Sequence, residues 1–314
     1  MSSEFLWVEK YRPQAISDIV LPESLKQTFQ KIVVSKELPN MLFTGTAGLG
    51  KTTVAKALCN ELGCDYILIN GSEEGNIDTL RTKIKQFASS VSLQGGYKVV
   101  ILDEADYLNP QSTQPALRGF IEEFSKNCRF ILTCNFPNRI IDPIHSRCTV
   151  VDFAIDPQDV PGLQMQFFKR LKQILDGKEI EYDQEVLARV IRRFYPDWRR
   201  LINEVQRYCS GGTLDTGVLA EVREIKMTGL VSAMKNKDYS TVRRWTVDNI
   251  NNDISVLYRK LYESLAKEDV LSRKYHPEVV LAIANYSRDV DRVPDQEIHL
   301  LACLTEIMMS CEFK

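Results

Sequence analysis

Apolar residues in the first half of the chain alternate between short continuous runs and longer stretches with helical spacing. The short runs are typical of buried strands and cover Met41–Phe43, Tyr66–Asn70, Val99–Leu102, Phe130–Cys134 and Thr149–Phe153. Helical spacing predicts helices between these runs, over residues 51–62, 77–91 and 111–125. Because buried strands that alternate with helices form parallel sheets, this half predicts an α/β domain with helices on both faces of its sheet.

The pattern changes after Asp156, beyond which no further strand is convincing. Helical periods follow over 162–175, 183–194 and 197–209, and the chain is again helical from about residue 228 to its end. Polar stretches at 249–253 and 292–295 are expected to connect helices in this last part. The sequence therefore predicts an α/β domain followed by two helical regions.

Composition and charge narrow the class of protein. Of 314 residues, 44% are hydrophobic, which is enough apolar content for two or three domains. The 40 Lys and Arg residues balance 42 Asp and Glu residues, so binding to nucleic acid would depend on a local basic face. No run approaches the roughly 18 apolar residues of a membrane span, and no signal-peptide core is present at the N-terminus. We expect an intracellular protein with no membrane partner and with buried, reduced cysteines.

Residues 45–52 (GTAGLGKT) match the phosphate-binding P-loop pattern at every fixed position, between a predicted strand and a predicted helix. Glycines let the backbone wrap around phosphate groups with its N–H groups pointing inward, and the helix adds its positive N-terminal end. Lys51 would neutralise phosphate charge, and the Thr52 hydroxyl would bind Mg²⁺. The predicted nucleotide contacts of this loop are Gly45, Gly48, Leu49, Gly50, Lys51, Thr52 and Thr53.

Two acids follow the apolar run at 99–102. Asp103 and Glu104 stand where that strand ends, at the edge of an open parallel sheet where ligands bind. Asp103 is suited to hold Mg²⁺ through water, and Glu104 is suited to polarise the attacking water. The letters of residues 103–106 (DEAD) also suggest a helicase. The later helicase motifs are missing and the chain after Asp156 is largely helical, which disfavours that class.

With these motifs placed, the whole chain resembles the AAA+ sliding-clamp-loader small subunits. This is the replication factor C small-subunit family, and the chain is most similar to its T-even-type bacteriophage branch. The resemblance rests on the segments at 7–13 (WVEKYRP), 18–20 (DIV), 133–135 (TCN), 146–148 (SRC), 196–199 (PDWR), 293–304 and 309–314. It implies a RecA-like AAA+ domain over residues 1–153, a helical lid over 154–225 and a helical collar for oligomerisation over 226–314. Apolar residues recur with helical spacing at Ile298, Leu301, Leu304 and Met308. This spacing fits an interface between collar domains and a core within one domain equally well.

The resemblance also implies roles for single residues. Asn135 corresponds to sensor 1, which detects the γ-phosphate. Arg147 corresponds to an arginine finger that reaches a neighbouring subunit's site, so that hydrolysis depends on assembly. Arg199 corresponds to sensor 2 on the lid, although Arg200 directly follows it. The N-terminal segment would lie over the adenine, with candidate base contacts at Val8, Glu9, Lys10, Tyr11 and Val20.

Contacts with DNA are implied for two helices. Residues 70–81 correspond to a DNA-binding element of the family, with Arg81 and Lys83 as its candidates, although a solvated polar helix face is nearly as good an interpretation. This chain has Gly75-Asn76 where the family often has an arginine. Gln111 and Ser112 open the next helix and could offer backbone donors to phosphates. Gln114 and Arg118 match a family element that couples DNA occupancy to Glu104.

The resemblance implies an ATPase that uses ATP and Mg²⁺. Its expected partners are copies of itself and a distinct large subunit in a pentamer, a sliding clamp, and primer–template DNA bound without sequence preference. ATP binding would assemble a spiral that opens the clamp, and hydrolysis would release the closed clamp on DNA. The expected location is the cytoplasm, that of the host if the chain is phage-encoded, at the replication fork. Two alternatives are another AAA+ remodeller, such as a helicase loader or branch-migration motor, and a structural subunit that binds nucleotide without hydrolysing it.

Overall fold

The computed structural model describes residues 6–90, 98–209, 212–214, 227–250, 254–267, 269–290 and 293–314. The chain divides into two compact units, Met1–Glu221 and Val222–Lys314. Each unit has its own hydrophobic core. The further division of the first unit into a nucleotide-binding domain and a lid, with a boundary after residue 153, stays a prediction.

A five-stranded parallel sheet forms the centre of the first unit, in the order β2-β3-β4-β1-β5. Its strands are β1 Met41–Thr44, β2 Asp65–Asn70, β3 Lys98–Asp103, β4 Cys128–Cys134 and β5 Thr149–Asp152. All five were predicted, because strands buried on both faces read as continuous apolar runs. Since the strands are parallel, the carboxyl ends of β1, β3 and β4 meet at one edge, and these ends carry the predicted P-loop, acids and sensor.

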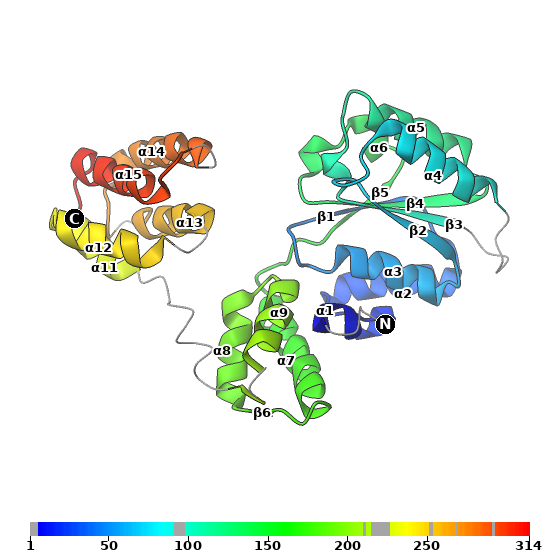
Figure 1. Cartoon of the computed structure of the whole chain (residues 1–314), viewed down its shortest axis with the longest axis horizontal. Coiled ribbons are helices and arrows are strands. Elements are labelled where there is room, and N and C mark those ends of the chain that lie inside the picture. The colour runs from blue at the N-terminus through cyan, green and yellow to red at the C-terminus, as the bar shows by residue number, and fades with distance from the viewer. Residues whose placement is uncertain are drawn as a thin grey trace. The chain divides into compact units, whose positions relative to one another are not determined.

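Helices cover both faces of this sheet (Figure 1). α2 (Glu23–Ser35) and α3 (Lys51–Glu61) lie on one face, and α4 (Ile77–Ser89) and α5 (Thr113–Glu123) on the other. Side chains alternate along each strand, so neighbouring residues enter different cores. Val99 and Ile101 pack in the core with α2 and α3, whereas Val100 and Leu102 pack in the core with α4 and α5. Each such fully buried side chain contributes about 1.5–3 kcal/mol.

Short helical segments connect the sheet to its surroundings. They are α1 (Trp7–Lys10), η1 (Ile16–Asp18), η2 (Ala105–Tyr107), η3 (Pro137–Arg139) and α6 (Asp142–His145). A three-helix group follows the sheet, formed by α7 (Val160–Asp176), α8 (Gln184–Phe194) and α9 (Trp198–Tyr208). All three helices were predicted. Side chains of Asp183 and Asp197 accept backbone N–H bonds at the starts of α8 and α9, as N-cap residues do.

The expectation of no strand after Asp156 was wrong. β6 (Glu181–Tyr182) pairs in parallel with β7 (Thr213–Leu214) beside the three-helix group. Strands of two residues are too short to produce an alternating pattern, so periodicity in the sequence could not reveal them.

The second unit is helical, with α11 (Met227–Lys235), α12 (Tyr239–Asn249), α13 (Ile254–Leu265), η5 (Arg273–Tyr275), α14 (His276–Asp289) and α15 (Gln296–Ser310). The connections predicted near 249–253 and 292–295 fall between helices, although residues 251–253 and Arg292 lie outside the described residues. Leu304 and Met308 are buried in this unit's own core, whereas Ile298 is 65% exposed. None of the helices described here is long and apolar enough to cross a membrane.

Candidate active site

The predicted P-loop leaves β1 and enters α3 with a backbone that suits close contact with phosphates. Gly48 has φ +81° and Gly50 has φ +88°, both in the left-handed region that favours glycine. Gly50 directly precedes α3, which begins at Lys51 as predicted. The unpaired N–H groups of this first turn therefore face the mouth of the loop, where a helix terminus attracts anions.

Lys51 is a buried cation, with only 7% of the residue exposed. Its Nζ donates to the carbonyl oxygens of Gly45 at 2.6 Å and Thr46 at 2.8 Å, and to Oδ1 of Asn135 at 2.9 Å. Burial lowers the pKa of Lys51, and the neighbouring carboxylate of Asp103 opposes that shift. Because its hydrogen bonds all go to neutral acceptors, this buried ammonium is suited to bind an anion.

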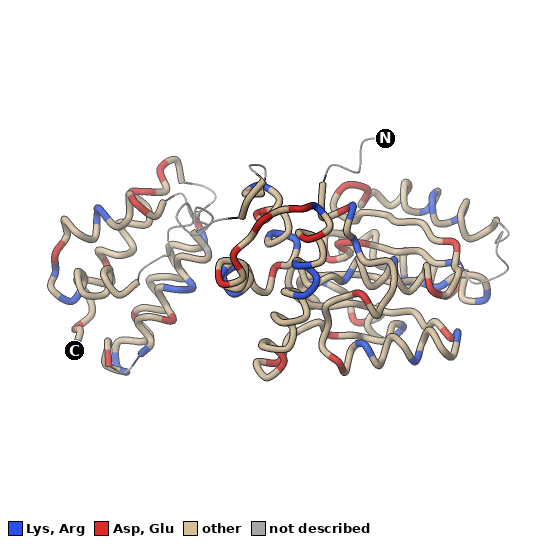
Figure 2. Tube along the Cα trace, turned by 90° about the horizontal axis from the view of Figure 1, so that it is seen from below, with Lys and Arg blue, Asp and Glu red and all other residues tan. Residues whose placement is uncertain are grey.

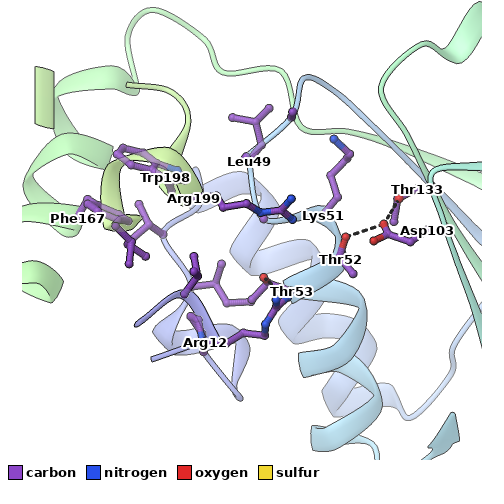
Figure 3. Close-up of a pocket in the computed structure, with 18 of the residues that line it drawn as sticks. Arg12, Leu49, Lys51, Thr52, Thr53, Asp103, Thr133, Phe167, Trp198 and Arg199 are labelled. Carbon is purple, nitrogen blue, oxygen red and sulfur yellow. Dashed lines mark hydrogen bonds between the residues drawn. The ribbon is translucent and has the colours of Figure 1, made fainter. Parts of the chain in front are cut away.

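Asp103, at the end of β3, connects the first turn of α3 with β4. Thr52 Oγ1 donates to Asp103 Oδ1 at 2.7 Å, and Thr133 Oγ1 donates to the same oxygen at 2.5 Å (Figure 3). A hydroxyl and a carboxylate oxygen therefore lie next to each other beside Lys51. These are the oxygen ligands that Mg²⁺ accepts when phosphates and waters complete its shell.

Glu104 follows directly, with a left-handed backbone at φ +55° and ψ +45°. Such a conformation costs about 1–3 kcal/mol for a non-glycine residue and is characteristic of functional sites. Its N–H donates to Thr133 Oγ1 at 3.2 Å, and its carbonyl accepts from Tyr107 N at 3.1 Å. Glu104 lines the same pocket as Lys51 and Asn135.

The pocket is closed by the N-terminal segment and by α7 and α9. From the predicted base contacts, Val8, Tyr11 and Val20 line it, whereas Glu9 and Lys10 do not. Glu9 instead forms an ion pair with Arg12, which lowers the pKa of Glu9. The ammonium of Lys10 lies 5.8 Å from the centroid of the Tyr11 ring. From the loop, Gly48, Leu49, Gly50, Thr52 and Thr53 line the pocket, and Gly45 contributes only its carbonyl to Lys51.

The start of α9 meets the P-loop. Asp197 accepts the N–H of Arg200 at 3.0 Å, and a Cβ on Gly48 would lie 2.1 Å from Asp197 Oδ1. Arg199 lines the pocket and points from α9 toward the P-loop (Figure 3). Arg200 lies 5.6 Å from the ring centroid of Phe194. Of the two consecutive arginines, Arg199 is therefore the one placed to reach a bound phosphate.

Sequence reasoning missed several pocket residues from α7 and α9. Phe167 and Trp198 stack with ring centroids 4.3 Å apart, and both line the pocket. Arg170 also lines it and donates to the Tyr11 carbonyl at 2.8 Å, while burial lowers the pKa of Arg170. Helical spacing predicted a helix over residues 162–175 and singled out neither Phe167 nor Arg170. A cation three residues later on the same helix face was the available signal.

Arg147 does not line this pocket. Its Nε donates to Glu122 Oε1 at 2.8 Å, and its Nη1 donates to the Pro143 carbonyl at 2.7 Å. The Arg147 side chain is 32% exposed, so the guanidinium faces the surface of its own subunit.

The residues considered for DNA contact lie on α4 and directly before α5, which begins at Thr113 rather than at Gln111 as predicted. Arg81 is exposed, 4.0 Å from Asp78, and Lys83 forms an ion pair with Glu74. The N–H groups of Gln111 and Ser112 donate to Asn109 Oδ1, so these two donors already have a partner. Lys, Arg, Asp and Glu alternate along the described trace rather than separating into regions (Figure 2).

Gln114 and Arg118 have different surroundings on α5. Gln114 is fully buried, and its Nε2 donates to the carbonyls of Leu108 at 3.0 Å and Arg139 at 2.9 Å. Its Oε1 accepts the N–H of Ile141 at 2.9 Å. Gln114 thus joins the segments that follow β3 and β4, whereas Arg118 is exposed one turn later.

Comparison with known proteins assigns families to both parts of the first unit. Residues 41–154 match the model described as ATPase family associated with various cellular activities (AAA). Residues 161–220 match the model described as sliding-clamp-loader large subunit, AAA+ ATPase lid domain.

Curated relatives extend the similarity along the chain. The chain is 38% identical over 247 residues to the sliding-clamp-loader large subunit of Escherichia phage RB69, covering 77% of each protein. It is 33% identical over 276 residues to the replication factor C small subunit of Methanothermobacter thermautotrophicus, covering 86% of this chain and 82% of that protein. The archaeal relatives are named small subunits, whereas the phage relatives are named large subunits, which differs from the designation expected for the phage branch.

Solved structures agree on the fold. The Thermotoga maritima RuvB Holliday junction branch migration motor superposes with a TM-score of 0.55 at 18% identity, covering 71% of this chain and 78% of that one. At this identity, the likeness shows a shared fold alone.

Proposed function

The chain belongs to the AAA+ sliding-clamp-loader family, which includes the replication factor C small subunits, and from this membership we propose how its ATPase site works. The protein is an ATPase subunit of a clamp loader. We propose that ATP binding arranges copies of this chain into a spiral that opens the clamp and binds primer–template DNA. Hydrolysis then releases the closed clamp on DNA.

One observation carries this proposal. Lys51, Thr52, Asp103, Glu104 and Asn135 converge on a single pocket that Arg199 also lines. A subunit that only binds nucleotide as a scaffold needs neither a carboxylate on a strained backbone at residue 104 nor a sensor bonded to the P-loop lysine. The site therefore favours hydrolysis over the structural alternative.

The residues divide the work of phosphoryl transfer. Lys51 and the N-terminal turn of α3 hold the phosphates and stabilise their charge. Glu104 accepts a hydrogen bond from the attacking water and orients it. Thr52 and Asp103 would hold Mg²⁺, whose charge neutralises phosphate oxygens in the transition state. Asn135 accepts a hydrogen bond from Lys51, which supports its proposed role in detecting the terminal phosphate.

Arg147 is proposed to complete the nucleotide site of a neighbouring subunit rather than that of its own subunit. Its guanidinium is absent from the pocket lining of its own subunit and bonds Glu122 and Pro143 at the surface. We propose that it enters a neighbouring subunit's site, where an arginine typically speeds phosphoryl transfer by about 10³–10⁵-fold. Hydrolysis then depends on assembly.

The proposed partners are copies of this chain, a distinct second kind of subunit, a sliding clamp and primer–template DNA. A pentamer and a distinct large subunit were expected from the sequence. Because the phage relatives are themselves named large subunits, the distinct subunit would carry the opposite designation in that branch. Arg81 and Lys83 are exposed on α4 and are proposed to contact phosphates.

Clamp loading on DNA tests this function directly. Labelled clamp would be mixed with primed circular DNA, the assembled loader and ATP, and clamp retained on DNA would be counted after the free clamp is removed. We expect retention that requires ATP and is lost with Lys51→Ala. Equal retention without this chain would refute the assignment.

A further inference from the structure

Gly71 lies against the backbone of the two acids at the end of β3. It directly follows β2, and its N–H donates to the Asp103 carbonyl at 2.7 Å. A Cβ built on Gly71 would lie 2.5 Å from the carbonyl oxygen of Glu104 and 3.2 Å from that of Asp103. The backbone of Gly71 is outside the left-handed region, so conformation does not require glycine here. Space alone requires it, because another backbone approaches too closely for a side chain.

Gly75 makes a similar close backbone contact, but with Gly71 rather than with the two acids. A Cβ on Gly75 would lie 2.6 Å from the carbonyl oxygen of Gly71. The Gly75 carbonyl in turn accepts from Thr113 Oγ1 at 3.2 Å, at the start of α5. Within the same turn, the N–H of Glu74 donates to the Asn70 carbonyl at 2.8 Å. Gly71 is therefore packed backbone to backbone against Glu104, and Gly75 is packed in the same way against Gly71.

Glu104 needs such support because its left-handed backbone is strained. A conformation of this kind persists only where the surrounding structure fixes it from several directions. The Glu104 N–H is held by Thr133 and its carbonyl by Tyr107, and Gly71 limits that carbonyl from a third side. A methyl group at residue 71 would push the peptide after Glu104 away from β2 and turn its side chain in the pocket. Displacements of about 1 Å near reacting atoms cost roughly 10²-fold in rate.

We infer that Gly71 and Gly75 are positioning residues for Glu104, which hold its carboxylate in the orientation that hydrolysis needs. Neither glycine lines the nucleotide pocket, so neither contributes to nucleotide binding. This inference rests on the proposed role of Glu104 as the residue that orients the attacking water. The turnover number then depends on the turn after β2 as well as on the residues that line the pocket.

Gly71→Ala in the assembled loader tests the inference, with Gly119→Ala as the matched control. Gly119 lies in α5, where an added Cβ would meet nothing within 4 Å. Steady-state ATPase with DNA and clamp would be measured beside the affinity for a fluorescent ATP analogue and the thermal midpoint. We expect Gly71→Ala to lower kcat by about tenfold or more while nucleotide affinity changes by less than about twofold. Gly119→Ala should keep both values.

Two results would overturn the inference. One is a folded Gly71→Ala loader that turns over at the wild-type rate, and the other is equal loss of kcat and nucleotide affinity. Gly75→Ala, one contact further away, gives the same test should Gly71→Ala fail to fold, and is expected to lower kcat less. Glu104→Gln separates this inference from its premise. If Glu104→Gln turned over normally, the proposed role of Glu104 would fail, whatever the glycine variants did.

Discussion

At the scale of the single residue, the account depends on a few charged groups in unusual surroundings. Lys51 is buried with neutral acceptors, Glu104 has a strained backbone, and Arg147 faces away from its own pocket. Burial of the Lys51 charge and the strain at Glu104 cost stability in an isolated subunit. All three residues are proposed to act only when nucleotide or a neighbouring subunit is present. Variants of these residues therefore separate binding, hydrolysis and assembly.

Lys51→Ala should abolish nucleotide-dependent function. The lysine would make charge-assisted contacts to phosphates, each worth about 1.5–3 kcal/mol, so affinity should fall by roughly 10²-fold. Titration with a fluorescent ATP analogue measures this loss. Lys31→Ala, an exposed lysine of α2, controls for the loss of one charge and should bind normally. Normal binding by Lys51→Ala would contradict the site.

Arg147→Ala should leave nucleotide affinity nearly intact and lower turnover by roughly 10³-fold, because its target is a neighbour's transition state. Mixing Arg147→Ala with Lys51→Ala subunits gives a sharper test. A Lys51→Ala subunit still offers Arg147 to an intact pocket on its neighbour, so mixed assemblies should regain part of the turnover that neither variant has alone. Weaker nucleotide binding by an isolated Arg147→Ala subunit would show that this residue acts within its own chain.

The cysteines should react slowly in the folded protein. All eight are free, and burial raises the pKa of Cys128 to about 11 and of Cys134 and Cys148 to about 12. Only the thiolate reacts, and a raised pKa leaves little of each cysteine in the thiolate form at pH 8. Mass spectrometry after iodoacetamide treatment should find Cys64, the one half-buried cysteine, modified first. Fast modification of Cys134 in the native protein would contradict its burial beside the site.

At the scale of the element, the sheet was predictable and the pocket's lid was not. The five strands are buried on both faces, so each one is a continuous apolar run that the sequence displays directly. Phe167 and Arg170 lie on a helix whose period shows only that one face is buried, not what it covers. Their meeting with Tyr11 depends on contacts between segments far apart in the chain, which no local pattern encodes. The same limit applies to the two-residue pair β6 and β7.

The N-cap of helix α15 allows a direct test of what stabilises the second unit. Asp295 accepts the N–H groups of Glu297 at 2.9 Å and Ile298 at 3.1 Å, and α15 then places Leu300 and Leu304 in the core. Asp295→Ala should reduce the free energy of unfolding by about 1 kcal/mol, because two N–H groups lose their acceptor. Urea unfolding measures this, and Asp289→Ala, at the other end of a helix, should cost less. An unchanged midpoint for Asp295→Ala would contradict the cap.

At the scale of the whole molecule, we propose that the site of this subunit is incomplete without a neighbour. The pocket brings together the residues proposed to bind phosphate, to hold Mg²⁺ and to orient water, whereas Arg147 lies outside it. Because the chain lacks a net positive charge, the proposed DNA contacts depend on single exposed cations of α4, such as Arg81 and Lys83. Turnover should therefore respond to everything that shapes the assembly, including DNA and the clamp.

The most direct test is the steady-state rate of ATP hydrolysis by the assembled loader, measured with and without primer–template DNA and with and without the clamp. The account predicts strong joint stimulation, greater than with either DNA or clamp alone, which weakens as salt screens the phosphate contacts. Arg147→Ala should remove this stimulation. A rate that is indifferent to the clamp would contradict the account and leave only an AAA+ ATPase with a different task.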